Sequence, residues 1–90
     1  MIFIRIVLKG INYMDAVDRI RSLREDSDKN QTEIAKLLNV EQKTYSDYET
    51  RKIRIPLESV IILARYYNVD MNYICGITDI KTPFPCKLKF

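Results

Sequence analysis

The sequence has no histidine, and its 90 residues include only two cysteines and two glycines. Histidine is the most frequent general base and a common zinc ligand, so its absence argues against catalysis and against a zinc site built on Cys75 and Cys86. Gly10 and Gly76 stand far apart, which excludes a glycine-rich loop that holds phosphate. We therefore expect no enzyme, no metal and no cofactor, with both cysteines free and Cys75 buried.

Long apolar runs are missing too. No stretch reaches the roughly 20 apolar residues that span a bilayer, and the opening MIFIRIVLKG lacks the charged region and the cleavage site of a signal peptide. We expect a cytoplasmic protein that does not bind membranes. The formal net charge is only +3, from 15 basic and 12 acidic residues, so any attraction to nucleic acid must come from the placement of charges.

What the sequence does contain is a series of short helical periodicities. A chain of 90 residues that is 47% hydrophobic, with few glycines and prolines, is typical of one small helical domain. Asn30 and Glu33 have the spacing of a capping box, while Pro56 and Gly76 are residue types that begin and end helices. The apolar spacing predicts five helices, at about 15–26, 31–38, 42–50, 57–67 and 71–75.

The second and third of these helices have the layout of a helix-turn-helix unit. They are about eight residues long and are joined by a turn at Asn39 and Val40, an arrangement in which the second helix can enter the DNA major groove. Helices this short are marginal in water, so the other helices must clamp the pair and hold its polar side chains rigidly. The residues expected to face the core are Ile34, Leu37 and Leu38 in the first helix of the unit and Tyr45 and Tyr48 in the second.

From Met14 to about Pro85 the chain resembles the phage-repressor-like helix-turn-helix regulators, also called the Cro/C1-type or xenobiotic-response-element family. The resemblance rests on RIRSLRED, NQTEIAKLLNV, YSDYE and IPLESVIILARYYNVDMNYICGITD. It implies an all-α, five-helix fold like the DNA-binding domain of lambda repressor at 14–76, between an arm at 1–13 and a tail at 77–90. It also implies a bacterial or phage DNA-binding regulator of transcription.

The resemblance assigns roles to particular residues. Phosphate contacts fall on Gln31, Arg51, Lys52 and Arg54. Contacts with base edges fall on Gln42, Lys43, Thr44 and Asp47, and a structural ion pair falls on Arg24 and Glu49. The chemistry of the side chains supports this independently, because a helix N-terminus favours an anion, glutamine can pair with adenine and lysine can donate to guanine.

Several positions depart from the family pattern. Glu41 stands at the N-cap of the third helix, where serine or threonine is common, and Asp28 and Lys29 replace a common Gly-Leu. Asp47 is acidic, so it either accepts a hydrogen bond from cytosine N4 or is an outward-facing structural acid. Arg51 replaces a glycine, so the loop either avoids a left-handed turn there or adopts one at a cost.

The first thirteen residues lie outside the resemblance. Either they are an extended reading frame, or Ile2 to Leu8 forms a strand that pairs with a strand at 86–90, CKLKF, in a short β-ribbon. A two-stranded ribbon is marginal alone and needs cover from the helices or from a second subunit. We expect a homodimer, with contacts among Ile2, Ile4, Ile6, Ile62, Tyr66, Leu88 and Phe90.

Two functions of different classes remain open. The first is a repressor that binds double-stranded DNA as a dimer, on an inverted-repeat operator. The second is an antitoxin or another protein-interaction module, whose apolar arm docks on a toxin. Salt separates them, because phosphate binding weakens steeply with salt whereas apolar docking does not.

Overall fold

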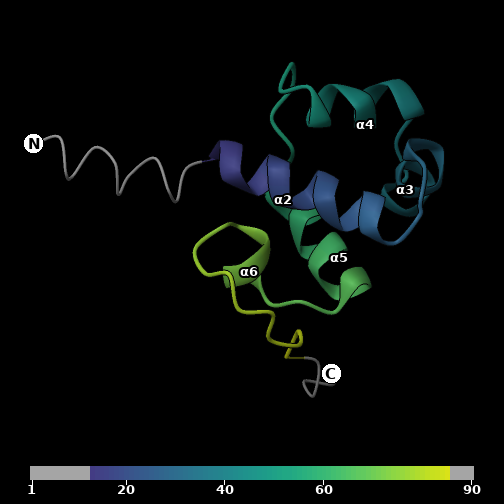
Figure 1. Cartoon of the computed structure of the whole chain (residues 1–90). Helices are drawn as coiled ribbons and strands as arrows, with labels where there is room; N and C mark the ends of the chain where they lie inside the picture. The colour runs from purple at the N-terminus through teal and green to yellow at the C-terminus, as the bar shows by residue number, and fades with distance from the viewer. Residues whose placement is uncertain (1–12, 86–90) are drawn as a thin grey trace, which may run out of the picture.

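The computed structural model describes residues 13–85, with side chains from Ala16 onward, and over this range the chain forms five α-helices and no β-strand (Figure 1). They are α2 (Tyr13–Asp26), α3 (Gln31–Leu38), α4 (Gln42–Glu49), α5 (Leu57–Tyr67) and α6 (Met71–Ile74). The predicted all-α fold class is therefore confirmed. Both strands of the predicted β-ribbon, Ile2 to Leu8 and 86–90, lie outside the described residues.

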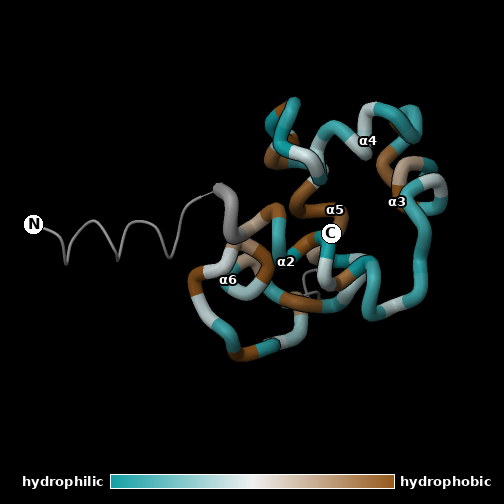
Figure 2. The backbone as a smooth tube through the Cα atoms, turned by 45° about the horizontal axis from the view of Figure 1, so that its top comes forward, coloured by the Kyte–Doolittle hydropathy of each residue, from teal (hydrophilic) through white to brown (hydrophobic). Residues whose placement is uncertain are grey.

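The helices are arranged around α2, which runs through the middle of the molecule (Figure 1). α3 and α4 pack against each other on one side, and α4 also packs against α2. α5 and α6 pack together on the other side, where α6 contacts α2 as well. In Figure 2 the tube is largely brown over α5 and teal or white over most of α4, so α4 is the more polar of the two helices.

The short helices begin and end at residues that satisfy their free backbone groups. The capping box at the start of α3 is present, because Asn30 Oδ1 accepts from the N–H of Glu33 at 2.8 Å and Glu33 Oε1 accepts from the N–H of Asn30 at 2.9 Å. α3 and α5 both end at an asparagine in the left-handed region, Asn39 at φ 60° and Asn68 at φ 57°. These local contacts fix the length of α3 and the turn that leads into α4.

One hydrophobic core joins all five described helices, and α2 contributes Ile20 and Leu23 to it. Its largest fully buried side chains are Ile34, Tyr45, Leu63 and Ile74, one from each of α3 to α6, with exposed fractions of 0 to 1%. A fully buried side chain of this size contributes roughly 1.5 to 3 kcal/mol. The core therefore holds α3 and α4 in place, although neither helix is long enough to be stable alone.

Two expectations about burial are wrong. Leu37 is 38% exposed, because the core side of α3 is formed by Ile34, Ala35 and Leu38. At 3.6 residues per turn, Leu37 lies about 100° away from the centre of that side. Cys75 is a free thiol, as expected, but it is half-buried at the edge of the core.

The segment after α6 folds back onto the helices. The N–H of Asp70 donates to the carbonyl of Thr82 at 2.8 Å, and the N–H of Phe84 donates to Asn68 Oδ1 at 3.2 Å. The ring of Phe84 packs against the core, and Arg19 Nη1 in α2 donates to the carbonyl of Thr78 at 3.1 Å. The chain up to Pro85 thus belongs to the same folded body as the helices.

Candidate nucleic-acid interface

α4 has a buried side and an exposed side. Tyr45, Tyr48 and Glu49 are all at most 6% exposed, and the two tyrosine rings meet edge to face with centroids 6.2 Å apart. Gln42 and Lys43, at the start of the helix, are exposed to solvent. The core therefore fixes α4 from one side and leaves its first residues available to a partner.

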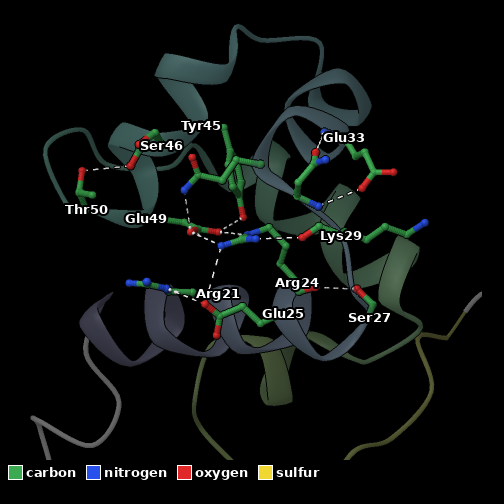
Figure 3. A network of polar contacts seen from close by, with 12 residues as sticks. Arg21, Arg24, Glu25, Ser27, Lys29, Glu33, Tyr45, Ser46, Glu49 and Thr50 are labelled. Carbon is green, nitrogen blue, oxygen red and sulfur yellow. Dashed lines mark hydrogen bonds and ion pairs between the residues drawn. The ribbon is translucent and has the colours of Figure 1, made fainter.

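The buried side of α4 carries a carboxylate that collects four hydrogen bonds (Figure 3). Arg24 Nε lies 2.7 Å from Glu49 Oε2, and Arg24 Nη2 lies 3.0 Å from Glu49 Oε1. The hydroxyl of Tyr45 donates to Oε2 at 2.5 Å, and Gln31 Nε2 donates to Oε1 at 3.1 Å. Arg24 also donates to the carbonyl of Lys29 at 2.9 Å, so this one cluster ties α2, α4 and the start of α3 together.

The protonation equilibria of this cluster favour the charged pair. Burial by itself would raise the pKa of Glu49, but the hydrogen bonds from Arg24, Tyr45 and Gln31 outweigh it, and this pKa lies below the ordinary glutamate value. The hydrogen bond to Glu49 raises the pKa of Arg24 against the opposing effect of burial. Burial, together with the hydrogen bond to Glu49, raises the pKa of Tyr45. At neutral pH the cluster thus holds one carboxylate, one guanidinium and a neutral phenol.

Gln31 connects this cluster to the exposed start of α4. Its Oε1 accepts a hydrogen bond from Gln42 Nε2 at 2.8 Å, while its own Nε2 donates to Glu49. A carboxylate only accepts hydrogen bonds, so Glu49 turns the amide nitrogen of Gln31 towards itself and the amide oxygen towards Gln42. The chain of contacts from Glu49 through Gln31 sets the position of Gln42.

The other expected base-reading residues differ in exposure, and the side chain of Lys43 is 78% exposed. Lys43 Nζ lies 3.6 Å from Asp47 Oδ1, one turn further along α4. The Asp47 side chain is only 16% exposed, so of the two alternatives the outward-facing acid does not fit the structure. Thr44 is half-buried. The hydrogen bond from cytosine N4 to Asp47 stays a prediction.

The segment between α4 and α5 carries the three expected phosphate-binding cations Arg51, Lys52 and Arg54, all exposed. Arg51 adopts the left-handed region at φ 65°, so of the two alternatives the loop takes the costly turn. Arg51 Nη2 lies 2.5 Å from Asp18 Oδ1 in α2. The sequence did not predict this pair, since its residues are 33 positions apart and share no local pattern.

The remaining expected contacts divide between α5 and the undescribed ends. Ile62 and Tyr66 lie one turn apart on α5 and are 40% and 43% exposed. The other expected contacts lie outside the described residues: Ile2, Ile4, Ile6, Leu88 and Phe90.

Between residues 13 and 85, the helices are too short or too polar to cross a bilayer. Over the same range, no group of three or more acidic or cysteine side chains could hold a metal ion.

Comparison with known proteins agrees with this arrangement. The helix-turn-helix family model matches residues 20–74, more than half of the chain. The uncharacterized HTH-type transcriptional regulator YobD of Bacillus subtilis (strain 168) is 34% identical over 65 residues, which cover 72% of this chain and 58% of that protein. The chain thus spans little more than half of the length of this relative, and no solved structure matches it. The chain belongs to the Cro/C1-type, or xenobiotic-response-element, family of helix-turn-helix transcriptional regulators.

Proposed function

We propose that this protein is a cytoplasmic, non-catalytic transcriptional regulator that binds double-stranded DNA by placing the start of α4 in the major groove. The observation that carries the proposal is the hydrogen-bonded chain from the buried carboxylate of Glu49 through Gln31 to Gln42. It holds an exposed amide in one orientation at the first turn of a helix that the core fixes from behind. Fixed polar groups are what direct reading of base edges requires.

Gln42 keeps the groups that pairing with adenine needs. One of its two amide N–H groups is used on Gln31, which leaves the second N–H and the carbonyl oxygen of the side chain for a base. Adenine presents an acceptor at N7 and a donor at N6 in the major groove, which match these two groups. Lys43 beside it can donate to guanine or hold a phosphate.

Phosphate contacts support α4 from two sides in this proposal. The N-terminus of α3, at Gln31, favours an anion through its dipole and its backbone N–H groups. The segment after α4 contributes Lys52 and Arg54, and Figure 1 shows this segment looping out beside the end of α4. Such contacts position the protein on the duplex without reading sequence.

We further propose that the protein represses transcription as a homodimer on an inverted repeat. One short helix reads only a few base pairs, whereas two copies can read half-sites about 34 Å apart. Ile62 and Tyr66 on α5 form an exposed apolar strip that suits a contact between two copies. Sedimentation over a range of concentrations tests this, because Ile62→Lys should convert a dimer to a monomer. A wild-type monomer at every concentration would contradict the dimer.

The main test is the affinity for DNA by fluorescence anisotropy, first with a randomised duplex pool and then with a duplex selected from it. Gln42→Ala should cost about 1 to 3 kcal/mol on the selected duplex and relax the preference at one base position. Lys43→Ala should weaken binding and, if it holds a phosphate, lower the salt slope by about one. Lys81→Ala is the charge-matched control, because Lys81 is also exposed but lies near the ring of Tyr73, away from α4.

A second function, an antitoxin or another protein-interaction module, uses the same exposed strip on α5. Ile62 and Tyr66 would then contact a different protein instead of a second copy. Salt-insensitive, equally weak DNA binding by the wild type and by the Gln42 and Lys43 variants would favour this function over DNA reading.

A further inference from the structure

The ion pair between Arg51 and Asp18 lies beside the proposed DNA-binding surface. Arg51 follows α4 by two residues, and its left-handed backbone is held by a hydrogen bond from its N–H to the carbonyl of Tyr48 at 3.2 Å. Its side chain reaches α2, where Nη2 meets Asp18 Oδ1 at 2.5 Å. The pair therefore engages one of the three cations in the segment proposed to contact phosphate.

This pair differs from the ion pair between Arg24 of α2 and Glu49 of α4. The side chains of Arg24 and Glu49 are only 12% and 2% exposed, so little of that pair is open to water or to DNA. The side chains of Arg51 and Asp18 are 32% and 69% exposed. A guanidinium donates to carboxylate and to phosphate oxygens with the same N–H groups. A DNA phosphate and Asp18 would therefore compete for the same donors of Arg51.

We propose that Asp18 lowers the affinity for DNA of any sequence by competing with phosphate for Arg51. This inference rests on the proposed function. Because a phosphate has the same chemistry at every base pair, Asp18 weakens non-specific and specific binding by the same factor. Base contacts of α4 then supply a larger share of the total affinity. Asp18 is thus a positioning residue, which acts on DNA through the side chain of Arg51.

A double-mutant cycle on the full chain tests the inference. The four proteins are the wild type, Asp18→Asn, Arg51→Ala and the double variant, titrated against a random-sequence duplex at several salt concentrations. Alanine keeps a Cβ at position 51, so the backbone meets the same steric cost there as with arginine. Asp79→Asn is the charge-matched control, since Asp79 pairs with Arg19 at 2.8 Å next to Thr78 and not beside α4. Thermal melting of each protein monitors the fold.

An exposed ion pair shifts an equilibrium by at most about five-fold, so Asp18→Asn should bind about two- to five-fold more tightly than the wild type. In the Arg51→Ala background the same change should leave the affinity nearly unchanged, because the cycle isolates the effect carried by the pair. Asp79→Asn should bind as the wild type does.

Four results would overturn the inference. Asp18→Asn could bind no more tightly than the wild type. The gain in affinity from Asp18→Asn could persist undiminished in the Arg51→Ala background. An equal gain could also appear in Asp79→Asn, and either result would indicate general charge repulsion. Finally, an absence of salt-dependent binding in the wild type and in every variant would overturn the proposed function, and the inference with it.

Discussion

Replacing Glu49 by glutamine should destabilise the fold far more than any exposed charge change. Glutamine keeps the shape of the side chain but removes the charge, and its amide N–H groups would face the donors of Arg24 and Tyr45. Arg24 would remain 12% exposed with its positive charge. Its nearest other carboxylate, that of Glu25, lies 3.9 Å away at the surface.

The expected loss of stability in Glu49→Gln follows from this geometry. Removing one partner of a buried ion pair costs about 3 to 5 kcal/mol. The exposed carboxylate of Glu25 stays near Arg24, so we expect the lower end, about 3 kcal/mol in the free energy of unfolding. For a domain of this size, that lowers the melting temperature by roughly 12 to 24 °C.

Urea denaturation and thermal melting, both followed by far-ultraviolet circular dichroism, measure this loss. Glu25→Gln is the matched control, because Glu25 also approaches Arg24 but its side chain is 54% exposed, and its loss should stay below about 1 kcal/mol. Replacing both members of the buried pair, as Arg24→Met with Glu49→Leu, should cost less than Glu49→Gln, since no unpaired charge remains. Equal losses of stability in Glu49→Gln and Glu25→Gln would refute the special cost of leaving the Arg24 charge unpaired.

Three further predictions concern acid, the helix ends and the core. The folded-state pKa of Glu49 is lowered, so its contribution to stability is complete above the ordinary glutamate pKa of about 4.3 and is lost as the pH falls through the lower value. Wild-type stability should therefore fall more steeply than that of Glu49→Gln below about pH 4, and parallel acid denaturation curves would contradict this. Glu41 makes no side-chain cap on α4, so Glu41→Ser should raise the free energy of unfolding in urea by about 0.5 to 1 kcal/mol. Asn30 does cap α3, so Asn30→Ala should lower it by about 1 kcal/mol. A lower stability of Glu41→Ser would contradict the missing cap. Leu63→Ala, at a site with 0% exposure, should cost about 2 to 5 kcal/mol in the same assay. Leu57→Ala on the same helix, at 66% exposure, should change stability by less than about 0.5 kcal/mol, and similar losses at both sites would refute the assignment of the core.

Local sequence patterns were sufficient for the features that depend on near neighbours. The capping box of Asn30 and Glu33 needs two side chains that are three residues apart, and it was predicted and is present. The all-α fold followed from helical spacing and from the resemblance to the family. Burial was predicted less well, as Leu37 and Cys75 illustrate, because exposure depends on which neighbouring elements cover a residue.

The contacts of the candidate site divide in the same way. The resemblance placed Arg24 beside Glu49, and the structure brings them into contact. It did not indicate that Gln31 bridges Glu49 and Gln42. These partners lie 18 and 11 residues apart and meet only after α3 and α4 have packed.

By itself the sequence determined the helical class, the helix-turn-helix pattern and the family, because helix signals act over a few residues and family motifs are read directly from the chain. Only the tertiary structure decided which charges meet. It buried one carboxylate against Arg24 and left another, that of Asp18, exposed against Arg51. The physical reason is that the energy of an ion pair depends on its distance and on its exposure to water, and neither is set by separation along the chain.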